Sequence, residues 1–496
     1  MPAAQAYDVI VVGGGPAGSV AAWALASRGA RVAVLERSVF PREKVCGDFV
    51  EPAGLRILAA MGCLDDLDDP LPITGARVFV GPRQVYQGAI PYYEDAHGLP
   101  THGFVVPRDV LDTRLLERAG VAGARVFQGC EASDLRREDG RMTIAARAGE
   151  HELELSAPLV IGADGAESMV ARRFSQRRAD RRYIALSQRA YVDGISGAGG
   201  EATLWFDDDL FPGYGWMFPM ADGRANVGVG ILSETCHRHG LSVPRAFSAC
   251  IEKLRIRHPA CAGIRLASRP LGGVVKTYGG AGPNHFHGGL LIGDAGSFAD
   301  PLTGEGITQG MESAMIAVPT LMAALEQGRF EAAFLGGFER DFRHHFDPSM
   351  RFLDLWAALT RNWRLREFWL RVTARGFDEA TRDADFARTS GAAFGGLNLR
   401  PLAVAEQVWS RLLAHVGQGG MADVAQLLAG RTPAALAGDL RAWRDGWTRS
   451  VAEDPTWHFA WLADVALKWA RLQPSLWGVR QSPRVDGPPA LATALS

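Results

Sequence analysis

The stretch Tyr7-Asp8-Val9-Ile10-Val11-Val12-Gly13-Gly14-Gly15-Pro16-Ala17-Gly18 decides the fold of this chain. Its apolar half, residues 7–12, ends at a glycine cluster, a pattern typical of a buried parallel strand. An alanine-rich helix is predicted over residues 16–28, because Gly29 follows as a helix-ending glycine, and a second strand is predicted over residues 30–36. The glycines form a GxGxxG turn between strand and helix, where backbone N–H groups and the helix dipole bind phosphate. We therefore predict a nucleotide-binding βαβ unit at the N-terminus.

The acidic residue Glu36 supports this prediction. It ends the second predicted strand, where a carboxylate accepts hydrogen bonds from ribose hydroxyls. A glycine turn that binds nothing is the alternative, since GxGxxG alone is a weak motif. The strand, the helix and the acidic residue all stand in register here, which favours a nucleotide site.

The composition of the chain excludes several classes of protein. Its 496 residues are 47% hydrophobic and 22% charged, which excludes collagen, a coiled coil and wholesale disorder. With a formal net charge of -2, the chain has no field that attracts nucleic acid. Its six cysteines lack the spacing of a metal site, so we expect reduced thiols and no metal. Without a signal-peptide pattern or an apolar run of about 18 residues, we expect a cytoplasmic protein with no spanning helix.

Later blocks of the sequence repeat the pattern of a strand followed by a turn. Two such blocks are Leu159-Val160-Ile161-Gly162-Ala163-Asp164-Gly165 and Gly289-Leu290-Leu291-Ile292-Gly293-Asp294, and the second leads to a helix predicted over residues 304–327. Between the blocks the hydrophobic period approaches two, which predicts strands over residues 76–90, 184–192 and 202–232, with a tight turn at Ala221-Asp222-Gly223-Arg224. From residue 329 the pattern is mostly helical, apart from a glycine-rich stretch at 390–398.

Three short motifs indicate which dinucleotide is bound. Val106-Pro107-Arg108-Asp109 precedes a predicted helix, Asp164-Gly165 follows one strand, and Gly293-Asp294 follows another. In this order, together with GxGxxG, they resemble the fingerprints of the para-hydroxybenzoate-hydroxylase-like flavoproteins. The resemblance implies that FAD is the cofactor, that Asp294 binds the flavin ribityl chain and that Arg108 lies over the FAD pyrophosphate. No separate second GxGxxG domain for NAD(P)H is visible.

Three longer motifs narrow the resemblance to the geranylgeranyl reductase family within these FAD-dependent oxidoreductases and monooxygenases. They are Phe40-Pro41-Arg42-Glu43-Lys44-Val45-Cys46-Gly47-Asp48, Gly213-Tyr214-Gly215-Trp216-Met217-Phe218-Pro219 and Asp300-Pro301-Leu302-Thr303-Gly304-Glu305-Gly306-Ile307. The resemblance covers about residues 5–400, and the final ninety or so residues extend beyond it. From both lines of reasoning, the residues expected to bind FAD are Gly13, Gly15, Pro16, Ala17, Gly18, Glu36, Arg37, Cys46, Gly47, Arg108, Ala132, Asp164, Asp294, Pro301, Gly304, Gly306 and Ile307.

The fold class that follows is α/β (α+β), with a Rossmann-like FAD-binding domain interrupted by an antiparallel-sheet substrate domain. We expect the FAD-binding domain over residues 1–75, 100–178 and 270–328, and the substrate domain over residues 76–99 and 179–269. A mostly helical C-terminal region is expected over residues 329–482, and a loose tail over residues 483–496.

The motif residues also have a chemical interpretation of their own. Gly304 and Gly306 open a helix, so their N–H groups are expected to point at the flavin N1/C2=O edge. Tyr214 and Trp216 share one face of a strand, where they form either an apolar wall for a flat or lipid-like substrate or plain packing, and the family motif favours the wall. Cys46 is expected near the flavin as a proton donor or ring contact, with a small buried hydrophobe as the alternative. Cys46, Tyr214 and Trp216 are the candidate catalytic residues.

Two features nearer the C-terminus are interpreted as structural. His344 and His345 are adjacent and point apart on a helix, so we expect surface residues rather than a metal site. An aromatic stripe recurs nearly every fourth residue, at Trp457, Trp461, Val465, Trp469 and Leu472. Packing onto the FAD-binding or substrate domain is the favoured interpretation of this stripe. A weak peripheral membrane contact, or a lid over a lipophilic substrate, is the alternative.

These residues predict an FAD-dependent oxidoreductase that acts on a hydrophobic small molecule, such as a prenyl, polyketide or aromatic substrate. In the reductase hypothesis, which the resemblance favours, reduced flavin gives hydride to a C=C bond and an acid such as Cys46 gives the proton. In the monooxygenase hypothesis, a flavin C4a-hydroperoxide transfers oxygen. NAD(P)H or another reductant is the expected electron donor, and a flavin reductase or a ferredoxin is an expected partner.

Two further interpretations stay open. The stretch Tyr214-x-Trp216-x-Phe218-Pro219 is a near relative of a Trp-x-Trp-x-Ile-Pro halogenase motif. Tyr214 and Phe218 depart from that motif, and the lysine that a halogenase needs would be Lys44, whose context resembles the reductases. The last interpretation is a non-catalytic flavoprotein, which would hold FAD without a cavity beside it.

Overall fold

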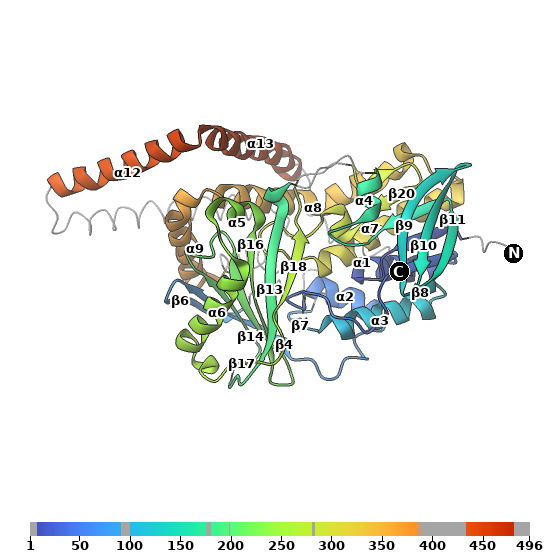
Figure 1. Cartoon of the computed structure of the whole chain (residues 1–496), viewed down its shortest axis with the longest axis horizontal. Helices are drawn as coiled ribbons and strands as arrows, with labels where there is room; N and C mark the ends of the chain where they lie inside the picture. The colour runs from blue at the N-terminus through green and yellow to red at the C-terminus, as the bar shows by residue number, and fades with distance from the viewer. Residues whose placement is uncertain are drawn as a thin grey trace.

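The computed structural model describes residues 7–90, 100–174, 180–197, 199–279, 283–384, 387 and 433–480. Within these residues, four sheets and the helices around them form the body of the molecule (Figure 1). None of the helices in the described ranges is long and apolar enough to cross a membrane.

A six-stranded sheet contains the N-terminal βαβ unit. Its strand order is β19-β20-β12-β1-β2-β8, and every pair is parallel except β19–β20. The strands are β1 (Val9–Val12), β2 (Val32–Glu36), β8 (Arg125–Gln128), β12 (Leu159–Gly162), β19 (His285–Phe286) and β20 (Gly289–Leu291). The strands predicted at both ends of the first helix and before the two later turns are confirmed. β8 was not predicted.

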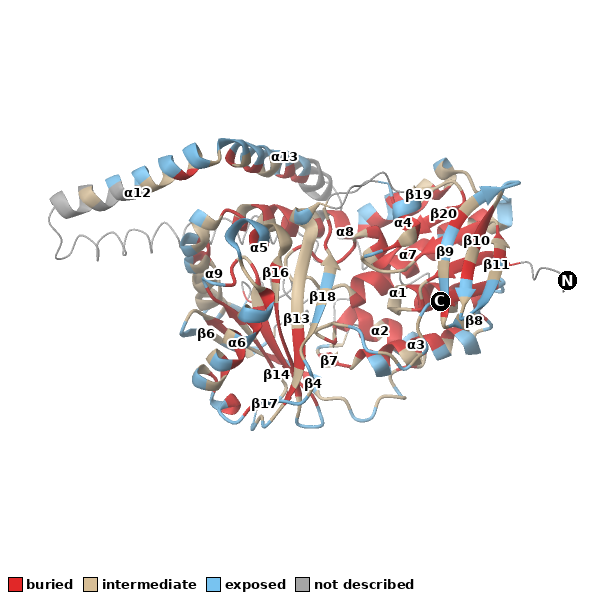
Figure 2. Cartoon of the chain, viewed as in Figure 1, coloured by how far each residue is buried: buried red, intermediate tan, exposed pale blue. Residues whose placement is uncertain are grey.

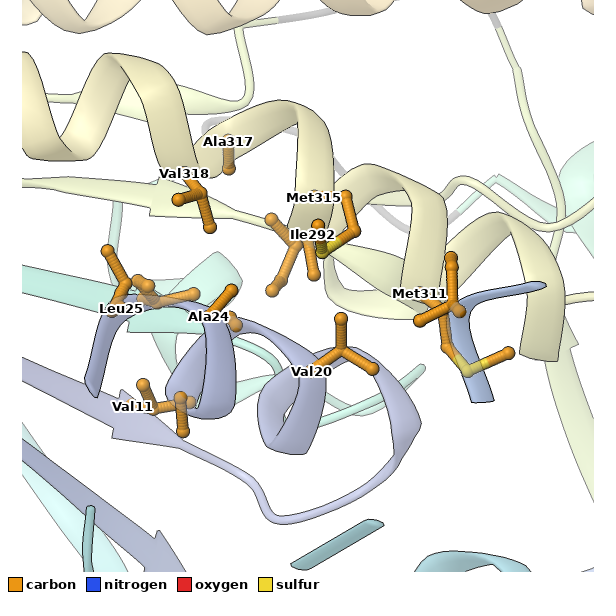
Figure 3. Close-up of a cluster of buried hydrophobic side chains, with 14 of the residues drawn as sticks. Val11, Val20, Ala24, Leu25, Ile292, Met311, Met315, Ala317 and Val318 are labelled. Atoms are coloured by element: carbon orange, nitrogen blue, oxygen red, sulfur yellow. The ribbon is translucent and has the colours of Figure 1, made fainter. Parts of the chain in front are cut away.

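The alternation of side chains along β1 divides the core around this sheet into two layers. Val9 and Val11 face α1 (Pro16–Ala26), α3 (Arg108–Val121) and α7 (Ile307–Gln327). Ile10 and Val12 face a three-stranded sheet made of β9 (Cys130–Glu138), β10 (Arg141–Ala148) and β11 (His151–Ala157). Figure 3 shows Val11 in the first layer, in one cluster with side chains of α1 and α7. The sheet is thus covered on both faces, as its continuous apolar strands require.

An eight-stranded sheet forms the second half of the body. Its order is β17-β13-β16-β15-β14-β5-β6, with β18 also paired to β13. The strands are β5 (Gly75–Val80), β6 (Arg83–Ala89), β13 (Ile184–Asp193), β14 (Glu201–Phe206), β15 (Tyr214–Pro219), β16 (Ala225–Leu232), β17 (Arg265–Leu266) and β18 (Leu271–Lys276). The expected antiparallel pairing is found at every pair except β5–β14, which is parallel. These two strands come from different parts of the chain, so no hairpin dictates their direction.

Each face of this second sheet has a different use. Met217, Val227 and Val229 point to one face, where α6 (Val243–Arg257) covers them. Trp216 and Phe218 point to the opposite face, towards the first half of the molecule. The predicted tight turn between β15 and β16 is confirmed, since the N–H of Met220 donates to the carbonyl of Arg224 at 2.8 Å.

The remaining described elements of the body include a small sheet and three short helices. A small sheet has the order β3-β7-β4, formed by β3 (Phe49–Val50), β4 (Pro72–Ile73) and β7 (Gly103–Val105). Of three short helices, α2 (Pro52–Ala60) packs on β7 and α7, α4 (Met169–Phe174) packs on β9 and β12, and α5 (Ser233–His239) packs on β13 and β16.

Four long helices follow in the part of the C-terminal region that the structure describes. They are α8 (Ala332–Thr360), α9 (Arg366–Ala380), α12 (Pro433–Glu453) and α13 (Pro455–Arg480). Figure 1 shows α13 lying along the body over α8, with α12 leading away from it. The predicted tail at residues 483–496 and the glycine-rich stretch at 390–398 lie outside the described residues.

The aromatic stripe of α13 packs on the predicted substrate domain only in part. The Trp457 indole N–H donates to Glu234 of α5 at 2.9 Å. By contrast, the Trp461 indole N–H donates to the Ala358 carbonyl at 2.8 Å, and Val465 and Leu472 pack in a cluster with α8 of the C-terminal region. Trp469 is 51% exposed, so the prediction is wrong at this residue. Steps of four residues rotate by about 40° each on a helix of 3.6 residues per turn, and three steps carry Trp469 out of the contact. Figure 2 shows the outer side of α13 as exposed.

The surface position expected for both histidines is wrong for His345. His344 is exposed, whereas His345 is buried and its Nε2 lies 3.4 Å from a Glu312 oxygen on α7. Adjacent residues on a helix are about 100° apart, so one of the two faces the core when the other faces water.

Candidate functional site

A cavity of about 650 Å³ lies where the N-terminal βαβ unit, the loop before α7 and the second sheet meet. All the residues predicted to hold FAD line it except Gly18, and the three candidate catalytic residues line it too. Gly18 lies behind the cavity wall, where an added Cβ would come within 1.9 Å of the Gly13 carbonyl oxygen. Gly18 therefore lets α1 pack closely on the turn that precedes it.

The start of α1 fits a diphosphate. The N-cap residue Gly15 provides no side-chain cap, so the first-turn N–H groups of α1 have no side-chain partner. A Cβ at Gly15 would point into open space, with Arg42 Nη2 the nearest atom at 3.8 Å. Arg42 Nη1 is buried and has no hydrogen-bond partner. Space, free N–H groups and a nearby guanidinium are what a pyrophosphate requires.

The carboxylate of Glu36 is fixed at the end of β2. Its two oxygens accept hydrogen bonds from the backbone N–H groups of Gly14 at 2.7 Å and Ser38 at 2.8 Å. Arg37 and Ala132 line the same part of the cavity. The carboxylate keeps further lone pairs, so the arrangement fits a ribose hydroxyl.

Arg108 is held rigidly at the start of α3. Its Nε and Nη2 atoms both donate to the Asp112 carboxylate at 2.7 Å, and Arg42 pairs with the same carboxylate at 2.8 Å. The fork geometry of Arg108 leaves its remaining N–H groups for the cavity.

Two predicted aspartates differ in what they contact. The carboxylate of Asp164 accepts hydrogen bonds from Ser168 Oγ at 2.5 Å and from the Met169 N–H at 2.6 Å, so its side chain caps α4. Asp294 lies beside Gly306 at the start of α7, where an added Cβ would come within 3.0 Å of Asp294 Oδ1. Burial raises the pKa of Asp294, and Lys44 and Arg108 oppose this effect.

The loop before α7 presents backbone rather than bulk to the cavity. Asp300 shapes it by accepting hydrogen bonds from the N–H groups of Leu302 at 2.7 Å and Thr303 at 2.8 Å. Gly304 has φ +72 and nothing within 4 Å of an added Cβ, so a glycine suits both its backbone and its open surroundings. The helix predicted from residue 304 begins at Ile307, because Gly306 is its N-cap and has no side-chain cap.

Glu305, in the same loop, was not predicted as a site residue. Its Oε2 is buried without a hydrogen-bond partner, and the side chain lines the cavity. Burial raises the pKa of Glu305 to about 8. The sequence feature that could have indicated Glu305 is its position between the two motif glycines Gly304 and Gly306.

The opposite wall of the cavity is aromatic. Tyr214, Trp216 and Phe218 alternate along β15, with ring centroids 6.0 Å apart for the first pair and 6.4 Å for the second. The prediction that Tyr214 and Trp216 share one face is thus confirmed. The Tyr214 hydroxyl donates to the Thr303 carbonyl, which ties this wall to the loop before α7.

Cys46 lines the same cavity as the aromatic wall and the loop before α7. Its thiol is free and partly buried. Burial raises its pKa, while the Arg108 guanidinium and the backbone N–H of Asp48 act in the opposite direction. The thiol therefore keeps its proton at neutral pH, beside groups that stabilise the thiolate once that proton leaves.

A buried polar cluster next to Cys46 was only partly predictable from the sequence. Asp48 accepts hydrogen bonds from the Tyr191 hydroxyl and from Asn226 Nδ2, both at 2.7 Å. Asn226 in turn accepts from the Trp216 indole N–H at 2.9 Å. Asp48 belongs to the motif over residues 40–48, but Tyr191 and Asn226 come from strands whose sequence carries no comparable motif.

Comparison with known proteins gives matches to flavoproteins. A family model described as "FAD binding domain" matches residues 6–191. A menaquinone reductase of Mycobacterium tuberculosis is 31% identical over 331 residues, which span 63% of this chain and 76% of the relative. A digeranylgeranylglycerophospholipid reductase of Methanopyrus kandleri is 31% identical over 361 residues, which span 70% of this chain and 84% of the relative.

Solved structures share the fold at lower identity. A geranylgeranyl bacteriochlorophyll reductase-like protein of Thermoplasma acidophilum superposes with a TM-score of 0.64 and 23% identity, covering 84% of this chain and 99% of that one. A flavin-dependent halogenase superposes with a TM-score of 0.62 and 21% identity, covering 84% of this chain and 78% of that one. These two likenesses concern the fold alone.

Proposed function

Since this chain belongs to the geranylgeranyl reductase family of FAD-dependent oxidoreductases, we propose that it reduces a carbon–carbon double bond of a hydrophobic, prenyl-type substrate. Its cofactor is FAD. Two relatives are reductases named for menaquinone and for a digeranylgeranylglycerophospholipid, and both of these molecules carry isoprenoid chains.

One observation carries the proposal. The thiol of Cys46 and the aromatic wall formed by Tyr214, Trp216 and Phe218 line the same cavity as the loops that fit FAD. An apolar wall binds a flat or lipid-like chain and keeps water from the reacting carbons. Cys46 is proposed to give a proton to such a chain beside the flavin.

The residues of the turn after β1 and of the loop before α7 are proposed to hold the cofactor. The open space at Gly15 and the N–H groups of α1 receive the pyrophosphate, Glu36 receives the adenosine ribose, and Asp294 receives the ribityl chain. Bound FAD supplies hydride transfer. NAD(P)H or another reductant is proposed as the electron source, delivered directly or by a flavin reductase or ferredoxin.

Cys46 is proposed as the acid. An isolated alkene is a poor hydride acceptor, so the carbon that does not receive hydride must receive a proton. The Cys46 thiol retains its proton at neutral pH because burial raises its pKa. Arg108 stands close enough to stabilise the thiolate that remains.

The test is anaerobic turnover in D₂O. Enzyme reduced with excess dithionite is mixed with menaquinone and, separately, with a geranylgeranyl lipid, and the products are analysed by mass spectrometry. We expect flavin oxidation without oxygen and a product that gains two deuterium atoms, one on each carbon of the former double bond, because the flavin N5 hydrogen and the Cys46 thiol hydrogen both come from the solvent. Turnover that requires oxygen and adds an oxygen atom would instead establish a monooxygenase.

A further inference from the structure

The carboxyl group of Asp48 lies two residues after Cys46, on the wall of the same cavity. Its side chain is fully buried. One oxygen, Oδ2, accepts both hydrogen bonds of the cluster, from Tyr191 and from Asn226. The other oxygen, Oδ1, is buried and has no partner. Because Oδ1 is buried and accepts no hydrogen bond, this oxygen is available to carry a proton.

Asn226 fixes this carboxyl group relative to Cys46. Its Nδ2 donates to Asp48 Oδ2 at 2.7 Å and to the Cys46 carbonyl at 2.8 Å. Asp48 itself has φ +63, a left-handed backbone conformation that is uncommon outside glycine, asparagine and aspartate. Its backbone N–H faces the Cys46 thiol.

Titratable groups from three parts of the chain lie near Asp48. Arg189 and Tyr191 face it from β13, Arg108 faces it from α3, and Cys46 lies in the same loop as Asp48. Arg189 is 1% exposed, and its Nη2 donates a hydrogen bond to the Lys44 carbonyl at 3.2 Å. Burial raises the pKa of Asp48 to about 6 against the opposing effects of Tyr191, Arg189, Asn226 and Arg108. The group thus gains and loses a proton near neutral pH.

We propose that Asp48 returns a proton to the Cys46 thiolate after each reduction. The inference rests on the proposed function, in which Cys46 gives its proton to the substrate. In the step added here, the O–H bond of Asp48 breaks and the S–H bond of Cys46 forms. The Asp48 carboxylate then takes a proton from water, and no electrons are exchanged. Transfer runs downhill, because the thiol has the higher pKa of the two groups.

Asp48→Asn is the decisive variant. One amide oxygen can accept from both Tyr191 and Asn226, as Oδ2 does now, and asparagine tolerates a positive φ. The amide cannot return a proton. Asp222→Asn is the matched control, because Asp222 lies in the exposed turn between β15 and β16, paired with Arg224.

The first readout is burst kinetics with excess dithionite and alkene. Cys46 starts each experiment protonated, so we expect Asp48→Asn to form one product per flavin at the wild-type rate. The following phase should be about 100-fold slower, the lower end of the range for loss of a positioned proton-transfer group. Asp222→Asn should show no slow phase. If the first turnover is slowed equally, or if no slow phase follows, the proposal is overturned.

The second readout does not depend on turnover. Alkylation of Cys46 by iodoacetamide, followed by peptide mass spectrometry in the FAD-loaded enzyme without substrate, reports the thiolate as a function of pH. Removal of the neighbouring carboxylate should move the midpoint to lower pH, since the Asp48 charge raises the pKa of Cys46. An unchanged midpoint means that the two groups are uncoupled and contradicts the proposal. Failure of the proposed function would appear in the wild-type enzyme as absence of alkene reduction, whereas failure of this inference appears only in the variant.

Discussion

The proposed role of Cys46 as an acid places two demands on its surroundings. The Cys46 thiol must hold its proton until substrate arrives, and burial ensures this by raising its pKa. It must also release the proton when hydride is transferred, and the Arg108 guanidinium and the Asp48 N–H stabilise the charge that results. A packing cysteine needs only the first of these features.

Replacement of Cys46 by serine tests this role directly. We expect Cys46→Ser to keep FAD and fold, while alkene reduction per bound flavin falls about 10²- to 10⁴-fold. Cys63→Ser is the control, since Cys63 is buried outside the cavity wall. This substitution should cost about 1–3 kcal/mol of stability without loss of turnover. Activity per flavin and the melting temperature separate the two effects. Equal turnover in both variants would leave Cys46 a packing residue.

Glu305 predicts a pH dependence of stability. Burial raises its pKa from 4.5 to about 8, so the folded chain keeps a proton that the unfolded chain releases. The free energy of unfolding therefore falls as pH rises between these values, by up to about 1.4 kcal/mol per pH unit. Glu305→Gln removes this loss, and its melting temperature should gain on the wild type from pH 5 to pH 8. The exposed Glu117→Gln variant should track the wild type, and parallel curves for Glu305→Gln would contradict the prediction.

At the scale of elements, the turn between β1 and α1 combines a helix start with an empty space. The backbone of Gly15 supplies the N-cap, and the missing side chain leaves room in the cavity. The sequence predicted this element well, because GxGxxG between a strand and a helix has one mechanical solution. Only its far end differs, since α1 ends at Ala26 rather than at residue 28.

Gly15→Val should therefore abolish FAD retention. The β-branched side chain would project into the space assigned to the pyrophosphate, where the nearest atom now lies 3.8 Å from an added Cβ. Gly272→Val is a matched control, because Gly272 is an exposed residue of β18 whose added Cβ also lies 3.8 Å from the nearest atom. Flavin absorbance per protein measures the outcome. A fully yellow Gly15→Val protein would show that FAD binds elsewhere.

Two glycines of β16 provide a test of the aromatic wall. A Cβ at Gly228 would lie 2.2 Å from Trp216 Cζ2, whereas a Cβ at Gly230 would lie 3.8 Å from Trp216 Cζ3. Gly228→Ala should push the indole off its place and lower turnover about tenfold or more while FAD is retained, because misplacement near 1 Å is costly in an active site. Gly230→Ala should have a much smaller effect. Similar losses in both variants would mean that the indole position does not matter.

At the scale of the whole molecule, buried ion pairs attach α13 to the body. Asp464 of α13 pairs with Arg361 and, at 3.2 Å, with Arg182, and Lys468 pairs with Asp354 of α8. Asp464→Asn leaves the buried Arg361 with a weaker set of partners, which should cost about 3–5 kcal/mol. Hydrogen exchange should then rise along α13. The exposed Asp445→Asn on α12 should change stability by less than about 0.5 kcal/mol, and an equal effect of both variants would show that the α13 pairs are not special.

The sequence predicted the parts of the fold in which each pattern has one physical solution. The buried strands of the first sheet are continuous apolar runs, and the β15–β16 turn contains a glycine at φ +79. The three-stranded sheet over residues 130–157 was missed, because one face of it meets water and charged residues such as Arg136 and Glu138 dilute the alternation. Trp469 was misplaced because a four-residue repeat drifts around a helix.

The candidate site was predicted where it lies in motifs and missed where it lies between strands. Residues that the motifs predicted and that line the cavity include Cys46, Trp216 and Gly304, which come from three distant parts of the chain. Asn226 and Tyr191 were missed, because their role depends on strand register, which places them opposite Asp48. Register is a property of paired strands, and single-strand patterns do not determine it.

The alternation of β15 has a consequence for how this enzyme can diversify. Tyr214, Trp216 and Phe218 line the cavity, whereas Gly215 and Met217 point to the opposite face, against Trp205 and Cys261. Mutations at the three even positions can therefore alter substrate range while the odd positions preserve the supporting core. A combinatorial library confined to these three positions should be rich in folded, yellow proteins with new specificities, and a library at the two odd positions should be poor in them. Natural selection, working on the same strand, would meet the same division.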